Sequence, residues 1–155
     1  MLGSGVQAPS FELPDLDSKS RSLEEMMADG KPLLVVFFKV SCPVCQLVFP
    51  FLERMAGAGE LRFIAISQDD AAATRNFHQR FGVTFPTLLD SARAGYPASN
   101  AFQITNVPSL FLIEPDGAIS LAISGFSRRD LETLGKRSGA QPFHPGEQVP
   151  EWKAG

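Results

Sequence analysis

The stretch Phe37-Phe38-Lys39-Val40-Ser41-Cys42-Pro43-Val44-Cys45 decides the fold. The apolar run over residues 33–38 that leads into it is typical of a strand buried on both faces, as in a parallel sheet. From Cys42 onward, apolar side chains recur at helical spacing as far as Met55. The sequence therefore predicts a buried strand, a short turn and a helix that begins at the cysteines.

Both cysteines of the chain lie at this predicted helix start, three positions apart. A thiol at a helix N-terminus feels the positive end of the helix dipole and unpaired backbone N–H groups, and both favour the thiolate. Since the thiolate is the species that attacks a disulfide, the pattern predicts thiol chemistry. With no distant cysteine pair, it suits a redox motif better than a disulfide-stabilised secreted scaffold.

The composition narrows the class of protein. The 155 residues are 44% hydrophobic and include 13 phenylalanines, which predicts one globular domain with a sizeable core. A net charge of -3 argues against nucleic acid as a partner. No apolar run approaches the roughly 20 residues of a membrane span. Residues 1–5 lack the features of a signal peptide, so we expect a cytoplasmic protein, or a periplasmic or exported one if a leader has been removed.

The rest of the chain predicts an α/β fold, with a central mixed β-sheet flanked by helices and an N-terminal β-hairpin. Strand and helix patterns alternate through the middle of the chain, where a strand–helix insertion separates two halves. The expected hairpin strands cover residues 10–13 and 18–22; the expected sheet strands cover 33–38, 61–67, 85–90, 107–113 and 119–123; besides the helix at the cysteines, helices are expected over 23–28, 71–81, 96–102 and 128–137.

We expect residues 1–139 to form one domain and residues 140–155 to form an extended C-terminal tail. The prolines of the tail, at 142, 145 and 150, predict that it has no regular structure. Its Trp152 is expected either to dock in an apolar groove or to be disordered.

Three features occur together in the order Cys42-x-x-Cys45, Pro50 and Val107-Pro108. Pro50 is expected to kink the helix, because it removes a backbone donor. A proline at the head of a buried strand needs special geometry, of which a cis peptide bond is one case. This set resembles the thioredoxin superfamily, which combines a C-x-x-C at a helix start, a kinking proline and a cis-proline that faces the cysteines.

The resemblance extends over almost the whole chain and is greatest to the redoxin branch, meaning the TlpA-like thiol-disulfide oxidoreductases and their AhpC-TSA (peroxiredoxin) relatives. Ala8-Pro9-x-Phe11-x-Leu13-Pro14-Asp15 looks like the entry of that branch. Two later blocks, Phe81-Gly82-Val83-Thr84-Phe85-Pro86 and the segment from Val107 to Gly117, look like its later motifs. The resemblance implies a thioredoxin-like fold and a thiol-disulfide oxidoreductase.

The resemblance also implies roles for individual residues. Cys42 would be the attacking thiolate and the more exposed sulfur, and Cys45 would resolve the mixed disulfide. The backbone of Val107 would pair with the substrate beside its disulfide, and Pro108, which has no N–H, would lie close to the sulfurs. Pro43 and Val44, between the cysteines, would complete the substrate-binding surface. The partners would be a protein disulfide and an upstream thiol reductant or oxidant, with no bound cofactor and no metal.

The chain departs from the family pattern near the second cysteine. Relatives place a buried carboxylate where this chain has Val36 or Val48. Because an apolar surrounding raises the pKa of a thiol, we expect Cys45 to be harder to deprotonate here. Water or Lys39 must then assist the proton transfer. Lys39 is also the nearest cation that could stabilise a Cys42 thiolate. Ser41 replaces the usual tryptophan, which is expected to change substrate choice.

Other interpretations are weaker but remain open. A peroxiredoxin-like thiol peroxidase would need a Thr or Ser three residues before its reactive cysteine and a Pro seven before, but Cys45 has Cys42 and Phe38 there. A non-catalytic thioredoxin-fold module could use Val107 to bind an extended segment, although the intact cysteines argue against it.

Structural readings of the remaining polar residues are simpler. A zinc site would need two more ligands, and the only histidines, at 78 and 144, lack the spacing of a zinc finger. We expect His78 on the exposed side of its helix. Asp69 and Asp70 are expected to act as helix caps.

Overall fold

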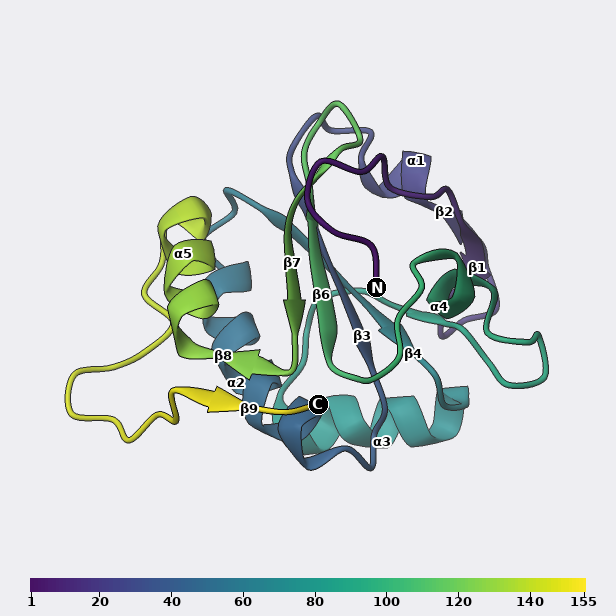
Figure 1. Cartoon of the computed structure of the whole chain (residues 1–155). Helices are drawn as coiled ribbons and strands as arrows, with labels where there is room; N and C mark the ends of the chain where they lie inside the picture. The colour runs from purple at the N-terminus through teal and green to yellow at the C-terminus, as the bar shows by residue number, and fades with distance from the viewer.

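The computed structural model describes residues 1–155 as a central sheet of five strands with helices on both faces (Figure 1). The strands lie in the order β5-β4-β3-β6-β7. Their bounds are β3 Leu33–Phe38, β4 Arg62–Ser67, β5 Thr87–Leu89, β6 Ser109–Ile113 and β7 Ile119–Ser124; the helices are α1 Leu23–Met26, α2 Pro43–Ala56, α3 Ala71–Phe81, α4 Pro97–Ala101 and α5 Arg128–Ser138. The predicted thioredoxin-like α/β fold with a mixed sheet is confirmed.

The pairing explains why the sheet is mixed. β3 runs parallel to β4, and β4 runs parallel to β5, with helices as the crossover connections. β6 pairs antiparallel with β3 on the other side, and β7 follows β6 after a tight turn. Because β3 is the central strand, its carboxyl end at Phe38 delivers the following turn to the middle of the molecule.

Successive side chains of β3 point to opposite faces and nucleate two cores. Leu34, Val36 and Phe38 pack with the helices α2, α3 and α5. Leu33, Val35 and Phe37 pack with the N-terminal hairpin and α4 on the opposite face. Every residue of β3 is buried, as the predicted two-sided burial requires. The predicted hairpin is confirmed as β1 Glu12–Pro14 and β2 Ser20–Ser22.

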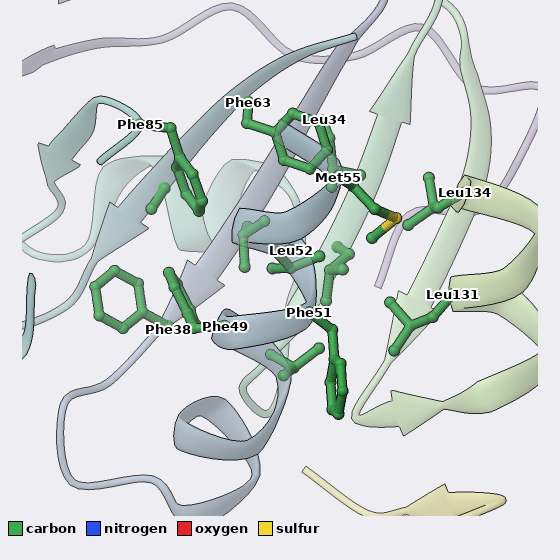
Figure 2. Close-up of a cluster of buried hydrophobic side chains, with 14 of the residues drawn as sticks. Leu34, Phe38, Phe49, Phe51, Leu52, Met55, Phe63, Phe85, Leu131 and Leu134 are labelled. Carbon is green, nitrogen blue, oxygen red and sulfur yellow. The ribbon is translucent and has the colours of Figure 1, made fainter. Parts of the chain in front are cut away.

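α2 is the helix that organises the larger core (Figure 2). On one side, its Phe49 ring lies 4.6 Å from the ring of Phe38. On the other side, Leu131 and Leu134 of α5 face Phe51 and Met55 (Figure 2). The helix continues through Pro50 rather than ending there. Aromatic contacts of this kind add to area burial and fix the helix firmly against the sheet.

The tail differs from its prediction, because it contains a short strand. β9, Trp152–Lys153, pairs antiparallel with β8, Phe126–Ser127, so residues 140–155 return across the molecule (Figure 1, yellow). Trp152 neither fills an apolar groove nor lacks structure, since it is 62% exposed within that strand. The prolines all precede β9, so the two residues that pair keep their N–H groups.

Two smaller predictions also need correction. His78 is half-buried, and its Nε2 lies 2.7 Å from the hydroxyl of Thr87, so it does not simply face solvent. Burial lowers the pKa of its imidazole. The strand β6, predicted to begin at Val107, begins instead at Ser109, because Pro108 has no N–H to contribute to strand pairing.

Candidate functional site

Cys42 is the N-cap of α2 and not a residue within it. Its backbone is extended, with φ -80° and ψ 116°, and its Sγ accepts a hydrogen bond from the Cys45 N–H at 3.2 Å. Pro43 occupies the first helical position, where a missing N–H costs nothing. The sulfur therefore lies at the positive end of the helix dipole and is already held by one of the free amides of the first turn.

The two cysteines differ sharply in burial. Cys42 is partly exposed, whereas Cys45 has no exposed surface and belongs to the core between α2 and the sheet. The two thiols are free and not joined in a disulfide. The predicted difference in exposure is therefore what the structure shows.

The loop before β6 brings a second part of the chain to Cys42. The peptide bond between Val107 and Pro108 is cis, and the Cys42 thiol lies 3.5 Å from the Val107 carbonyl oxygen, which accepts its hydrogen bond. Pro108 is buried and its own carbonyl accepts from the Gly125 N–H at 2.8 Å. Val107 is half-buried, and its N–H has no backbone partner. Residues far apart in sequence thus meet at one edge, as predicted.

The surroundings of Cys45 disfavour its thiolate. Burial is the main cause that raises the pKa of the Cys45 thiol, followed by its hydrogen bond with Cys42 and the negative charge of Asp69, while the Lys39 backbone opposes them only in part. Val36 and Val48 have no exposed surface and supply no polar group. The expected resistance of Cys45 to deprotonation is borne out in direction.

Asp69 is the residue whose position the sequence did not suggest. Its Oδ2 accepts the Val40 N–H at 2.8 Å and so holds the turn that precedes Cys42. On the other side of that turn, Gln46 Nε2 donates to the Val40 carbonyl at 2.9 Å. Asp70, not Asp69, caps α3 by accepting the Ala73 N–H at 2.8 Å. The sequence did contain a signal for this role of Asp69. A helix needs only one N-cap residue, so one of two adjacent aspartates before α3 remains available for another contact.

The remaining candidate residues lie around the mouth of the site. Pro43 is exposed and Val44 is half-buried on the first turn of α2. Lys39 is half-buried, and together with Val107 it lines a pocket of about 420 Å³ that also includes Tyr96 and Asn106. The structure therefore places every predicted site residue within one region at the carboxyl end of β3.

The fold and the site together define a redoxin with a thioredoxin-like fold and a C-x-x-C dithiol, the arrangement of thiol-disulfide oxidoreductases. The AhpC/TSA family matches residues 4–122, so the chain belongs to that family.

Named relatives agree with this class. The chain is 27% identical to thiol-disulfide oxidoreductase ResA of Bacillus subtilis over 129 residues, which cover 80% of this chain and 69% of ResA. It is 30% identical to methylamine utilization protein MauD of Paracoccus denitrificans over 130 residues, covering 84% of this chain but only 63% of MauD.

The thioredoxin domain of a Bacteroides vulgatus thiol-disulfide oxidoreductase, BVU-2223, superposes with a TM-score of 0.77 at 21% identity, covering 88% of this chain and 98% of that domain. At this identity the likeness concerns the fold. None of the helices in the structure combines the length and hydrophobicity that a membrane span requires.

Proposed function

We propose that the protein exchanges electrons with protein disulfides through Cys42 and Cys45. One observation carries the proposal: the Cys42 sulfur lies at the start of α2 between the Cys45 N–H and the Val107 carbonyl. A partly exposed sulfur held at a helix N-terminus is placed to attack, and a buried thiol one turn further on is placed to finish the reaction.

The reaction runs in two balanced steps. The Cys42 thiolate attacks one sulfur of the substrate disulfide, a mixed disulfide forms, and the other substrate sulfur leaves as a thiolate that takes up a proton. Cys45 then loses its proton and attacks the Cys42 sulfur, and the second substrate sulfur leaves. The substrate gains two electrons and two protons, and the protein is left with a Cys42–Cys45 disulfide.

The same geometry indicates where the backbone of a protein substrate would bind, namely at Val107; we call this place the substrate edge. The unpaired Val107 N–H offers a donor to an extended substrate backbone, in the manner of strand addition to a sheet edge. Pro43 and Val44, on the first turn of α2 next to Cys42, complete the surface that we assign to the substrate. Lys39, half-buried three residues before Cys42, is the cation that we assign to the support of the attacking sulfur. Pro108 contributes shape, because it brings no N–H of its own to compete for the sulfurs.

The protein needs two partners to turn over. One is a protein disulfide, and the other is an upstream thiol reductant or oxidant that resets the Cys42–Cys45 pair. The direction follows from the reduction potential of the pair relative to its compartment. A reducing cytoplasm would make the protein a reductase, and an exported location would require a dedicated partner.

Insulin reduction tests the assignment of roles. Cys42→Ser is expected to abolish reduction, because no nucleophile then remains at the mouth of the site. Cys45→Ser is expected to accumulate a mixed disulfide with substrate, visible by mass spectrometry as the added mass. Full activity of Cys42→Ser would overturn the assignment. Peroxide consumption is the matched negative assay, and peroxide turnover without insulin reduction would favour a thiol peroxidase instead.

A further inference from the structure

Gly155 lies directly against Val107, at the edge that we assign to the substrate, and Lys153 and Ala154 lie against Gly125. A Cβ built on Gly155 would be 2.5 Å from the Val107 carbonyl oxygen and would also clash with the Asn106 side chain. A Cβ built on Gly125 would clash with the Lys153 carbonyl and lie 2.9 Å from the Gly155 nitrogen. Both contacts leave no room for a side chain, so the backbone of the tail is closely packed there.

The tail reaches this edge in extended form. β9 pairs with β8 in the register Phe126 with Lys153 and Ser127 with Trp152. The next two residues pass Gly125, and Gly155 reaches Val107. An extended backbone beside Val107 is also what a bound substrate strand would present.

We propose that residues 152–155 form a strap that occupies the substrate edge at Val107 and must move away before a protein disulfide can bind, an inference that rests on the proposed function. The strap stands in for the substrate backbone, so strap and protein substrate compete for one place. A small disulfide needs only the partly exposed Cys42 sulfur and does not need that edge. The strap therefore selects against protein disulfides and leaves small ones unaffected.

The anchoring of the tail shows where it can open. Its middle is held firmly, because Arg54 forms paired hydrogen bonds of 2.8 and 2.9 Å to the Glu147 carboxylate and also donates to the Pro142 carbonyl at 2.9 Å. The ring of Phe143 packs 4.9 Å from the ring of Phe51. These contacts keep residues 142–147 on the body of the protein.

The end of the tail is held much less. Its pairing with β8 is two residues long, and all four residues from 152 to 155 are exposed. The contact just before this segment is made by Glu151. Its carbonyl accepts a hydrogen bond from the Arg128 N–H at 3.0 Å, and its carboxylate forms an exposed ion pair with the Arg128 side chain. Exposed ion pairs and short edge pairings contribute little. The strap can therefore detach while residues 142–147 stay in place.

Two variants remove the strap from the edge by different means. One ends the chain after Glu151, which retains the anchors at Arg54 and Arg128. The other, Gly155→Val, keeps the full length but adds a side chain where the Val107 carbonyl leaves no space. Gly3→Val is the matched control, because nothing lies within 4 Å of a Cβ at Gly3.

Each protein is assayed with insulin and with hydroxyethyl disulfide. If the strap is open about one fifth of the time, both strap variants gain about fivefold in kcat/KM for insulin, because affinity scales with the competent fraction. Turnover of hydroxyethyl disulfide is expected to stay unchanged in both variants, and Gly3→Val is expected to match the parent. An unchanged or reduced insulin rate in the strap variants overturns the strap. Loss of both activities in the parent protein would instead overturn the proposed function.

The only tryptophan of the chain, Trp152, gives a direct readout of movement. In the Cys45→Ser variant, a tryptophan-free peptide of about ten residues that contains one cysteine is trapped on Cys42 through a mixed disulfide. The strap predicts a fall in the fluorescence anisotropy of Trp152 on trapping, since the segment gains motion when it leaves β8. Unchanged anisotropy in a fully trapped sample would contradict the strap independently of any rate.

Discussion

Cys42 and Cys45 share one helix turn but have opposite surroundings. Cys42 lies at the mouth of the site, with a backbone donor on one side and the Val107 carbonyl on the other. Cys45 lies among the apolar side chains that join α2 to the sheet and has no exposed surface. The two cysteines of one C-x-x-C motif therefore have different chemical roles, because Cys42 lies at the start of α2 and Cys45 lies in the core.

The largest expected effect concerns the rate at which Cys45 resolves a mixed disulfide. Because burial raises the pKa of this thiol far above neutral, the thiolate fraction grows about tenfold per pH unit across the accessible range. Reaction with Ellman's reagent, followed by stopped-flow release of the second thiol, measures this step. We expect a log-linear rise without a plateau from about pH 6 to about pH 10, that is, beyond the ordinary pKa of a thiol. A rate that levels off at about pH 9 would show an ordinary thiol pKa and contradict the effect of burial.

The second prediction concerns stability. The pKa of Cys45 in the folded protein lies above its ordinary value of 9.0. The contribution of its protonated thiol to the free energy of unfolding is therefore fully present below pH 9.0 and is lost as the pH rises further. The unfolded chain then binds fewer protons, and the free energy of unfolding falls by about 1.4 kcal/mol per pH unit. Urea unfolding of the reduced protein and of Cys45→Ala, compared between pH 8 and pH 10, measures the difference. An identical pH dependence in the two proteins would show that Cys45 titrates normally.

A third prediction tests the part of Asp69 in the surroundings of Cys45. Asp69→Asn removes a negative charge that raises the pKa of Cys45, although burial remains the larger cause. We expect resolution to become about two- to fivefold faster, because a lower pKa increases the fraction of Cys45 present as thiolate. Asp70→Asn is the matched control. It removes the same charge from the neighbouring residue, which is exposed and caps α3. Equal effects of the two variants would refute a specific role for Asp69.

The smallest expected effect concerns the mouth of the site. Lys39→Gln removes the cation that we assign to the support of Cys42. We expect the attack of Cys42 on a small disulfide to slow by about two- to threefold at low salt, and less at high salt because of screening. Stopped-flow kinetics at two ionic strengths measure this. A faster attack in the variant would contradict the proposed role of Lys39.

Local motifs allowed much of the site to be predicted from the sequence. The C-x-x-C at a helix start and the Val107-Pro108 pair each carry their geometry within a few residues, so their positions could be anticipated. The apolar side chains of Val36 and Val48 likewise predicted that Cys45 is hard to deprotonate, because an apolar surrounding disfavours the thiolate.

The features that sequence reasoning missed depend on pairing between distant segments. Asp69 binds the Val40 N–H across the ends of two neighbouring strands, which no local pattern specifies. β9 forms because the chain after α5 returns to β8, and three prolines concealed it. His78 is half-buried because Thr87 of β5 lies beside it, and this too requires the sheet order.

The most direct test of the account is competitive alkylation of the reduced native protein. A limiting amount of iodoacetamide is added, and the two cysteine positions are quantified by peptide mass spectrometry before and after unfolding in urea. We expect Cys42 to be modified almost alone in the native protein and Cys45 to react only once the chain is unfolded. Equal modification of both positions, or preferential modification of Cys45, would contradict the division of tasks between the two sulfurs.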